Sequence, residues 1–157
     1  RVGLPLKVAA KVDTADKAYF EREIEPLLAH ANVEFVGEIN DAQKPAFLGN
    51  ARALLFPIDW PEPFGLVMIE AMACGTPVVA WNCGSVPEVI DEHITGRIVD
   101  NEDDAVAATR EVIGYDRRAV RATFERRFTA SAMADRYVQL YDRLAQGRES
   151  DFGLRLA

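Results

Sequence analysis

The sequence predicts an α/β domain in which helices cover both faces of a doubly wound parallel sheet. Short apolar runs alternate with helical patterns from the start of the chain to residue 99. These runs are continuously apolar, which is typical of strands covered on both faces of a parallel sheet. The length of 157 residues fits a single domain, because domains usually hold ~100–200 residues.

The first part of the pattern gives two pairs of a strand and a helix. Residues 5–10 predict a strand, and residues 15–30 predict an amphipathic helix with apolar side chains at helical spacing. Residues 33–36 predict a short strand closed by Gly37. Asp41 is a suitable N-cap for the next helix, which is predicted to run to about residue 49.

The second part continues the alternation and then turns to helices alone. A strand at 53–56 ends at a proline-rich loop, and an apolar helix at 65–74 is ended by a glycine. The remaining predicted elements are strands at 77–81 and 96–99, a short helix opened by Pro87, and helices at about 102–113, 117–127 and 130–146. We expect residues 1–146 to form one partial domain and residues 147–157 to be a flexible polar tail.

Composition excludes several classes of partner. The formal net charge of −7 does not provide the basic face that nucleic acids require, so we expect no nucleic-acid partner. No apolar run reaches the ~20 residues of a membrane span. Cys74 and Cys83 lack a metal-ligand spacing, so we expect no metal and a reducing, cytoplasmic setting.

The first residues have the pattern of a helix end. Arg1 is followed by Gly3 and Pro5, and a predicted strand begins at once. We therefore expect that the chain lacks a segment that precedes this point. The alternative is a natural N-terminus with a ragged start.

Most of the chemical information lies between residues 56 and 75, where a predicted strand leads into the apolar helix. Open parallel sheets bind ligands at such strand ends. On the helix 65–74, Glu70 is the one residue with a polar side chain, and a buried carboxylate needs a donor from the protein or from a ligand. Gly65 opens the helix, whose free N–H groups suit a phosphate. Glu62 adds a second carboxylate in the preceding loop.

Each of these features also has a purely structural interpretation. Glu70 could pair with an internal arginine or a backbone group, and Glu62 could be a solvated loop residue. Taken together, two carboxylates that flank the start of an apolar helix at a strand end favour a binding site.

Glu62 and Glu70 form an E-x7-E motif. The motif stands within Glu-Pro-Phe-Gly-Leu (62–66) and Glu-Ala-Met-Ala-Cys-Gly-Thr-Pro-Val-Val-Ala (70–80), and Gly-Ser-Val-Pro-Glu-Val-Ile (84–90) follows. With these motifs, residues 4–145 resemble the nucleotide-sugar domain of retaining group 1, or family 4, glycosyltransferases with the GT-B architecture. The densest match covers residues 53–100. The resemblance implies a Rossmann-like sheet, the C-terminal half of a GT-B fold, with its first strand missing.

The resemblance also implies a role for each matching position. Glu62 would be the catalytic residue that contacts the donor sugar near the reacting centre. Backbone N–H groups of Phe64, Gly65 and Leu66 would hold the sugar or the diphosphate. Glu70 would accept hydrogen bonds from the ribose hydroxyls. The group implied near the base is Gly37, Glu38, Ile39 and Lys44.

The implied activity is that of a hexosyltransferase in carbohydrate biosynthesis. It would move a sugar from a nucleotide-diphosphate sugar to an acceptor, retaining the anomeric configuration and using no cofactor or metal. The family's Gly-Arg…Lys-Gly loop and its N-terminal acceptor domain have no match here, so the isolated chain is expected to be inactive. A missing first strand would leave a slot with open strand edges, through which the chain would self-associate unless it belongs to a longer polypeptide.

Other functions on the same architecture remain open. They are a sugar-nucleotide epimerase, a glycan phosphorylase that would need a lysine-bound pyridoxal phosphate, and a non-catalytic nucleotide-binding module. The arginines of residues 117–127 predict a solvated helix face or, alternatively, a contact with the inner face of a membrane. Apolar residues at helical spacing in the last helix predict a packing stripe, made of Met133, Tyr137, Leu140, Tyr141 and Leu144.

Overall fold

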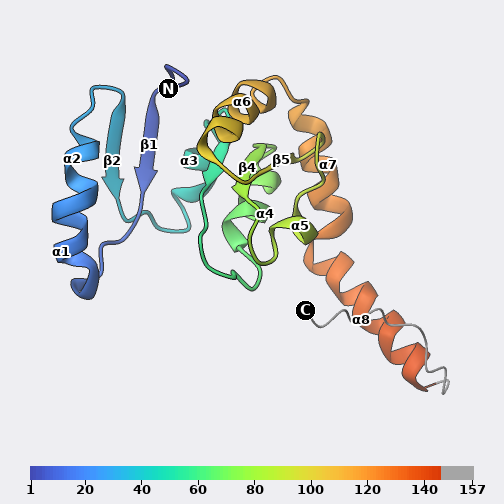
Figure 1. Cartoon of the computed structure of the whole chain (residues 1–157). Helices are drawn as coiled ribbons and strands as arrows, with labels where there is room; N and C mark the ends of the chain where they lie inside the picture. Colours follow the sequence, from blue (N-terminus) through green and yellow to red (C-terminus); the bar gives the residue numbers. More distant parts are fainter. Residues whose placement is uncertain (146–157) are drawn as a thin grey trace.

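The computed structural model describes residues 1–145 and arranges their strands in two parallel sheets (Figure 1). β1 (Leu6–Ala9) pairs with β2 (Val33–Gly37). β3 (Leu54–Phe56), β4 (Val78–Trp81) and β5 (Gly96–Val99) form the second sheet in that order. Every pairing is parallel, which confirms the predicted fold class. The tail predicted at 147–157 lies outside the described residues.

No strand pairing joins the two sheets within residues 1–145. Within residues 1–145, β1 pairs only with β2, and β3 pairs only with β4, so the facing edges of β1 and β3 carry no ladder. In the doubly wound order, the first strand lies between these two positions. The interruption therefore coincides with the open slot expected from the sequence, and exposed Leu6 and Leu55 lie on the two strands that face it.

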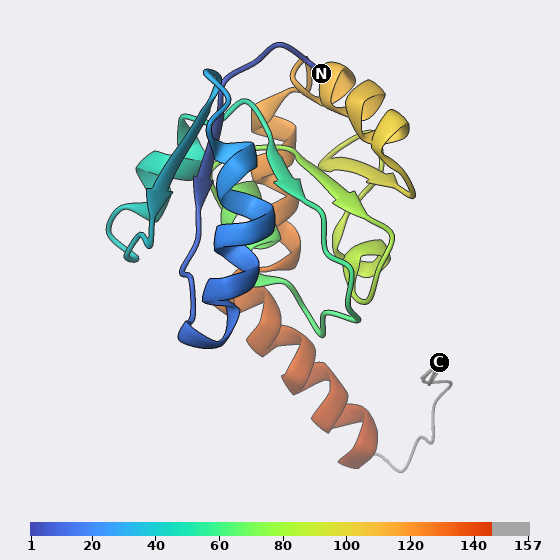
Figure 2. The ribbon, with the colours of Figure 1, turned by 60° about the vertical axis from the view of Figure 1, so that its left-hand side comes forward.

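The helical run after β1 changes its hydrogen-bonding pattern along its length. It passes from a 3₁₀ turn (Thr14–Asp16) through α1 (Lys17–Tyr19) and a π-helical stretch (Phe20–Ile24) to α2 (Glu25–Leu28). Pro26 lacks the N–H that an unbroken α-helix would use at the end of the π stretch. Phe20 packs on Phe35 of β2, with ring centroids 5.4 Å apart, and Figure 2 shows this run alongside the first sheet.

The helix predicted to have Asp41 as its N-cap begins two residues later, as α3 (Lys44–Gly49) with Gln43 at the N-cap. Asn40 and Gln43 exchange hydrogen bonds between side chains and backbone in the preceding turn, at 2.9 and 3.1 Å. Their reciprocal bonds satisfy two free N–H groups, as in a capping box. The prediction of Asp41 as N-cap is therefore wrong, because its neighbour Asn40 makes the turn and Asp41 remains exposed.

The core is formed on both faces of β4. Val78 and Ala80 point into a cluster with α4 (Leu66–Ala73), α5 (Val86–Val89) and α7 (Arg117–Arg127). Val79 lies in a second cluster with α6 (Glu102–Val112). Because successive side chains of a strand point to opposite faces, a strand covered on both must be apolar throughout. This explains the continuous apolar run in the sequence.

The last helix, α8 (Ala130–Ala145), extends away from the sheets (Figures 1 and 2). Its predicted packing stripe is largely exposed, since Met133, Tyr137, Tyr141 and Leu144 face solvent in the described part of the chain. The expectation of a packed stripe is therefore wrong for this structure. No helix within residues 1–145 has the length and apolar character needed to cross a membrane.

Candidate functional site

The candidate site is formed where the chain leaves the carboxyl ends of β3 and β4. A long loop joins β3 to α4 and carries Glu62, and Figure 1 shows it beyond the end of the sheet. A short turn joins β4 to α5 and packs against this loop. Its residue Ser85 donates its N–H to the carbonyl of Glu62 at 3.0 Å.

Gly65 shapes the start of α4. It is the buried residue at the N-cap and has a left-handed backbone, with φ of +72°. A Cβ at this position would lie 2.6 Å from Cε of Met68. Glycine adopts this left-handed conformation without strain. The conformation turns the chain so that the loop before α4 lies close to the first turn of the helix. As a result the Gly65 N–H donates to Oε1 of Glu62 at 3.2 Å, and the carboxylate covers the start of the helix.

Glu70 lies farther along α4 and is paired with a lysine from α3. Nζ of Lys44 is 3.1 Å from Oε1 of Glu70 and 3.0 Å from Oδ1 of Asp41. The side chains of Lys44 and Glu70 are 36% and 34% exposed. Hydrogen bonds, first to Asp41 and then to Glu70, raise the pKa of Lys44. The lysine supplies the donor that partial burial of the Glu70 carboxylate requires.

The structure brings together only some of the predicted site residues. Phe64 and Leu66 flank Gly65 and expose their side chains, and the Phe64 ring lies edge-on to Phe128 at 6.3 Å. Gly37 is the last residue of β2, in the other sheet, and Glu38 and Ile39 follow it. No hydrogen bond within residues 1–145 links them to the two glutamates. Of the group assigned to the base, Lys44 alone contacts Glu70.

Sequence reasoning missed the support that the β4–α5 turn gives to the loop. Sγ of Cys83 donates to the carbonyl of Trp60 at 3.1 Å. Gly84, next in the chain, packs directly on the backbone of Glu62. The pattern that could have indicated this contact is a glycine placed immediately after a predicted strand end.

Two arginines of α7 differ from the solvated helix face that the sequence predicts. Arg117 donates to the carbonyls of Gly49, Ala51 and Cys74 and to Oγ1 of Thr76, at distances of 2.6 to 3.3 Å. Arg127 pairs with Asp91 and donates to the carbonyls of Glu88 and Val89. The prediction of a solvated face is therefore wrong for these two side chains, which hold helix ends and loops together.

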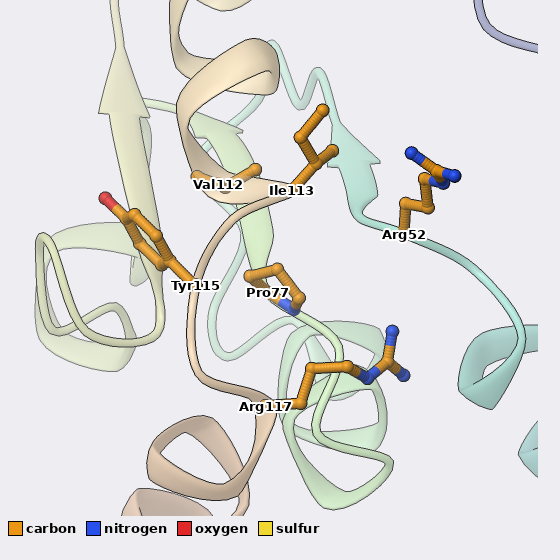
Figure 3. Close-up of a pocket in the computed structure, with 6 residues that line it drawn as sticks. All are labelled: Arg52, Pro77, Val112, Ile113, Tyr115 and Arg117. Carbon is orange, nitrogen blue, oxygen red and sulfur yellow. The ribbon is translucent and has the colours of Figure 1, made fainter.

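A cavity of about 170 Å³ lies beside Arg117 (Figure 3). Arg52, Pro77 and Val112 are among its lining residues. It lies at the amino ends of β3 and β4, opposite the glutamates, and its Arg117 is already engaged by protein acceptors. We therefore assign no ligand to it. Within residues 1–145, no group of three or more His, Cys, Asp and Glu side chains could hold a metal ion.

Comparison with known proteins assigns the chain to a family. The model of the family described as glycosyl transferases group 1 matches residues 2–119. The chain belongs to this family. The matched segment contains both glutamates, Gly65 and Lys44.

Two similar proteins cover more than two thirds of this chain. An uncharacterized 41.2 kDa protein in the cps region of Klebsiella pneumoniae is 35% identical over 116 residues, covering 70% of this chain and 32% of that protein. A phosphatidyl-myo-inositol mannosyltransferase of Mycobacterium leprae is 30% identical over 141 residues, covering 85% and 37%. This chain thus spans less than two fifths of these relatives.

Solved structures share the fold. AviGT4, a glycosyltransferase involved in avilamycin A biosynthesis, superimposes with a TM-score of 0.73 and 28% identity, over 93% of this chain and 45% of that one. Anabaena HepE in complex with UDP and glucose gives a TM-score of 0.70 at 21% identity, over 90% and 40%. The second likeness concerns the fold alone.

Proposed function

We propose that this chain binds the nucleotide-diphosphate sugar of a glycosyltransferase that retains the anomeric configuration. The observation that carries the proposal is the order of groups along one segment. Glu62, the N-terminus of α4 and the Glu70–Lys44 pair follow one another at the carboxyl edge of the sheet. Membership of the glycosyl transferases group 1 family supports a glycosyl donor as the ligand.

Each group would meet a different part of the donor. Glu70 would accept from the ribose hydroxyls, and Lys44 would lie beside the ribose and the base, toward Gly37, Glu38 and Ile39. The N–H groups of Phe64, Gly65 and Leu66 would face the diphosphate or the sugar. Negative charge that develops on the leaving diphosphate would then be stabilised by the start of α4.

Glu62 would orient the sugar through its hydroxyls. Its carboxylate already accepts from Gly65, so the donor must either share that N–H or replace the carboxylate there. A sugar hydroxyl that donates to Glu62 while a phosphate oxygen accepts from Gly65 satisfies both groups. With this exchange, Glu62 would contribute to the affinity for the sugar and not to the affinity for the nucleotide.

We further propose that the acceptor binds on a separate N-terminal domain. The isolated chain would then bind the donor without transferring the sugar. A lipid-linked acceptor at the inner face of a membrane is supported by exposed arginines of α7 and by the likeness to the M. leprae phosphatidyl-myo-inositol mannosyltransferase. Self-association through the open edges of β1 and β3 is tested by light scattering, and a monomer at all concentrations would exclude it.

The donor proposal is tested by an NMR titration of the chain with UDP, GDP and ADP. We expect shifts at residues 62–70 and 37–44 that favour one nucleotide and disappear in Glu70→Ala. The matched control is Glu125→Ala, which removes a carboxylate on α7, near the opposite end of α4, paired with Arg121 at the surface. Equal responses to all nucleotides, or an unchanged response in Glu70→Ala, would contradict the proposed site.

Two other functions give different outcomes. An epimerase would interconvert nucleotide sugars without any acceptor, which product analysis after incubation detects. A non-catalytic module would bind the nucleotide with no added affinity for the attached sugar. Comparing each nucleotide with its sugar conjugate therefore separates it from a donor site that uses Glu62.

A further inference from the structure

The β4–α5 turn contacts the backbone of the loop that carries Glu62 at three consecutive residues. Sγ of Cys83 donates to the carbonyl of Trp60 at 3.1 Å. The Ser85 N–H donates to the carbonyl of Glu62 at 3.0 Å. Between them, Gly84 lies against the peptide of Glu62 itself.

Gly84 makes the tightest of these contacts. Its backbone is left-handed, with φ of +56°. A Cβ at this position would lie 2.5 Å from both N and O of Glu62 and 3.0 Å from the carbonyl carbon of Pro61. All of these are backbone atoms, which cannot rotate away as the end of a side chain can. Any side chain here must push the Glu62 peptide out of place.

Glu62 is thus held on two sides. The turn fixes its backbone from behind, and the Gly65 N–H holds its carboxylate in front. The hydroxyl of Ser85 is buried, with the residue 8% exposed, and no described group bonds to it. Ser85 therefore supports the loop through its backbone N–H and not through its side chain.

We propose that Gly84 is a positioning residue for Glu62. Its missing side chain, together with the Ser85 N–H, sets where the Glu62 carboxylate stands relative to the start of α4. The proposal rests on the proposed function in assigning Glu62 to the donor sugar. It adds that the geometry at the sugar is determined from β4, through a residue that touches no substrate.

The direct test is an NMR pH titration of the Gly65 amide. Because this amide donates to Glu62, its chemical shift should change when the carboxylate takes up a proton and the hydrogen bond weakens. Glu62→Gln identifies the signal by abolishing this step. We expect Gly84→Ala to abolish it too, with Glu62 still present. The control is Gly114→Ala, where a Cβ would meet only ordinary contact, 3.5 Å from the carbonyl of Glu111.

A second variant keeps the test valid if Gly84→Ala does not fold. Ser85→Pro replaces the N–H that donates to Glu62 by the ring Cδ, which presses on the same carbonyl, and the Ser85 φ of −74° suits proline. It adds no atom at Gly84, and we expect a reduced pH step with the far-UV circular dichroism unchanged. A full pH step at Gly65 in both variants would overturn the proposal.

The second readout is affinity for the sugar conjugate of the nucleotide that the wild-type chain prefers, compared with that nucleotide alone. Gly84→Ala should weaken binding of the sugar conjugate about tenfold, the effect of losing one hydrogen bond to a charged group. Binding of the nucleotide should stay within about twofold, because within residues 1–145 no hydrogen bond or ion pair joins Glu70 or Lys44 to the turn. An equal loss for both ligands would mean that Gly84 acts only on stability and would overturn the proposal.

The two readouts separate this inference from the proposed function. If Gly65 loses its pH step in Gly84→Ala while the wild-type chain binds no nucleotide sugar, positioning of Glu62 stands and the donor assignment fails. If nucleotide sugars bind through Glu62 but the pH step survives, the donor assignment stands and the role of Gly84 fails.

Discussion

Arg117 provides the most direct test of how the α4 layer is held in place. Its guanidinium donates to three carbonyls, of Gly49, Ala51 and Cys74, and to the hydroxyl of Thr76. These carbonyls lie at the ends of α3 and α4, where the last C=O groups of a helix have no partner in the helix. One side chain therefore satisfies acceptors from both helices. Replacing it by methionine keeps much of the apolar stem and removes every donor.

The magnitude follows from these bonds. A hydrogen bond from a charged donor is worth ~1.5–3 kcal/mol, but bonds that share one guanidinium do not add. We expect Arg117→Met to lower the free energy of unfolding by about 3 kcal/mol. With a slope of ~2 kcal/mol per molar urea, the midpoint falls by about 1.5 M. Lysine should not restore it, because an ammonium cannot reproduce the planar fork.

The assay is urea unfolding followed by circular dichroism. The matched control is Arg118→Met, since Arg118 is exposed and its guanidinium bonds to no group within residues 1–145. We expect the control to change the free energy of unfolding by less than ~0.5 kcal/mol. Similar small effects for both variants would refute the assignment of Arg117 as the link between the two helix ends.

Three further changes test the site and its surroundings. Ser85→Ala should raise the free energy of unfolding by about 1 kcal/mol, since it removes a buried hydroxyl without a described partner, and a loss on urea unfolding would reveal a hidden bond. Gly65→Ala should lower it by ~1–2 kcal/mol through the left-handed backbone, and titration should show weaker nucleotide binding. Burial, followed by the hydrogen bond to Glu111, raises the pKa of Tyr115 to about 12. Its neutral form is thus favoured in the folded chain, so the stability that it contributes is complete below pH ~10 and is lost as pH rises toward 12. Unfolding of Tyr115→Phe should lack this part of the alkaline loss, and the near-ultraviolet difference titration against wild type should show the late ionisation.

The parallel sheet could be predicted because its signal is local. Val78, Val79 and Ala80 form an unbroken apolar run since both faces of β4 are buried, and such a run is typical of a strand inside a parallel sheet. The need of Glu70 for a partner also follows from the sequence, because the rest of its helix is apolar. Which residue would be that partner does not follow, since Lys44 comes from another helix.

The missed features depend on contacts between distant segments. Arg117 looks like any surface arginine until the ends of α3 and α4 are placed beside it. Gly84 looks like any turn glycine until the Glu62 peptide is placed 2.5 Å from its absent Cβ. The prediction of a packing stripe on α8 is wrong for the opposite reason. Helical spacing predicts an apolar face, but not which surface covers it, and none does within residues 1–145.

The pairing of both glutamates with groups of the protein bears on how the proposed donor would be selected. Glu62 accepts a hydrogen bond from Gly65, and Glu70 pairs with Lys44, so both carboxylates have a partner in the protein. A donor bound as proposed would exchange these bonds for its own, and the gain would be the difference between two satisfied states. A bare diphosphate could take the Gly65 N–H but would leave Glu62 without a donor. A nucleotide sugar offers hydroxyls to both carboxylates, and so the internal pairing itself would favour the complete donor over its nucleotide product.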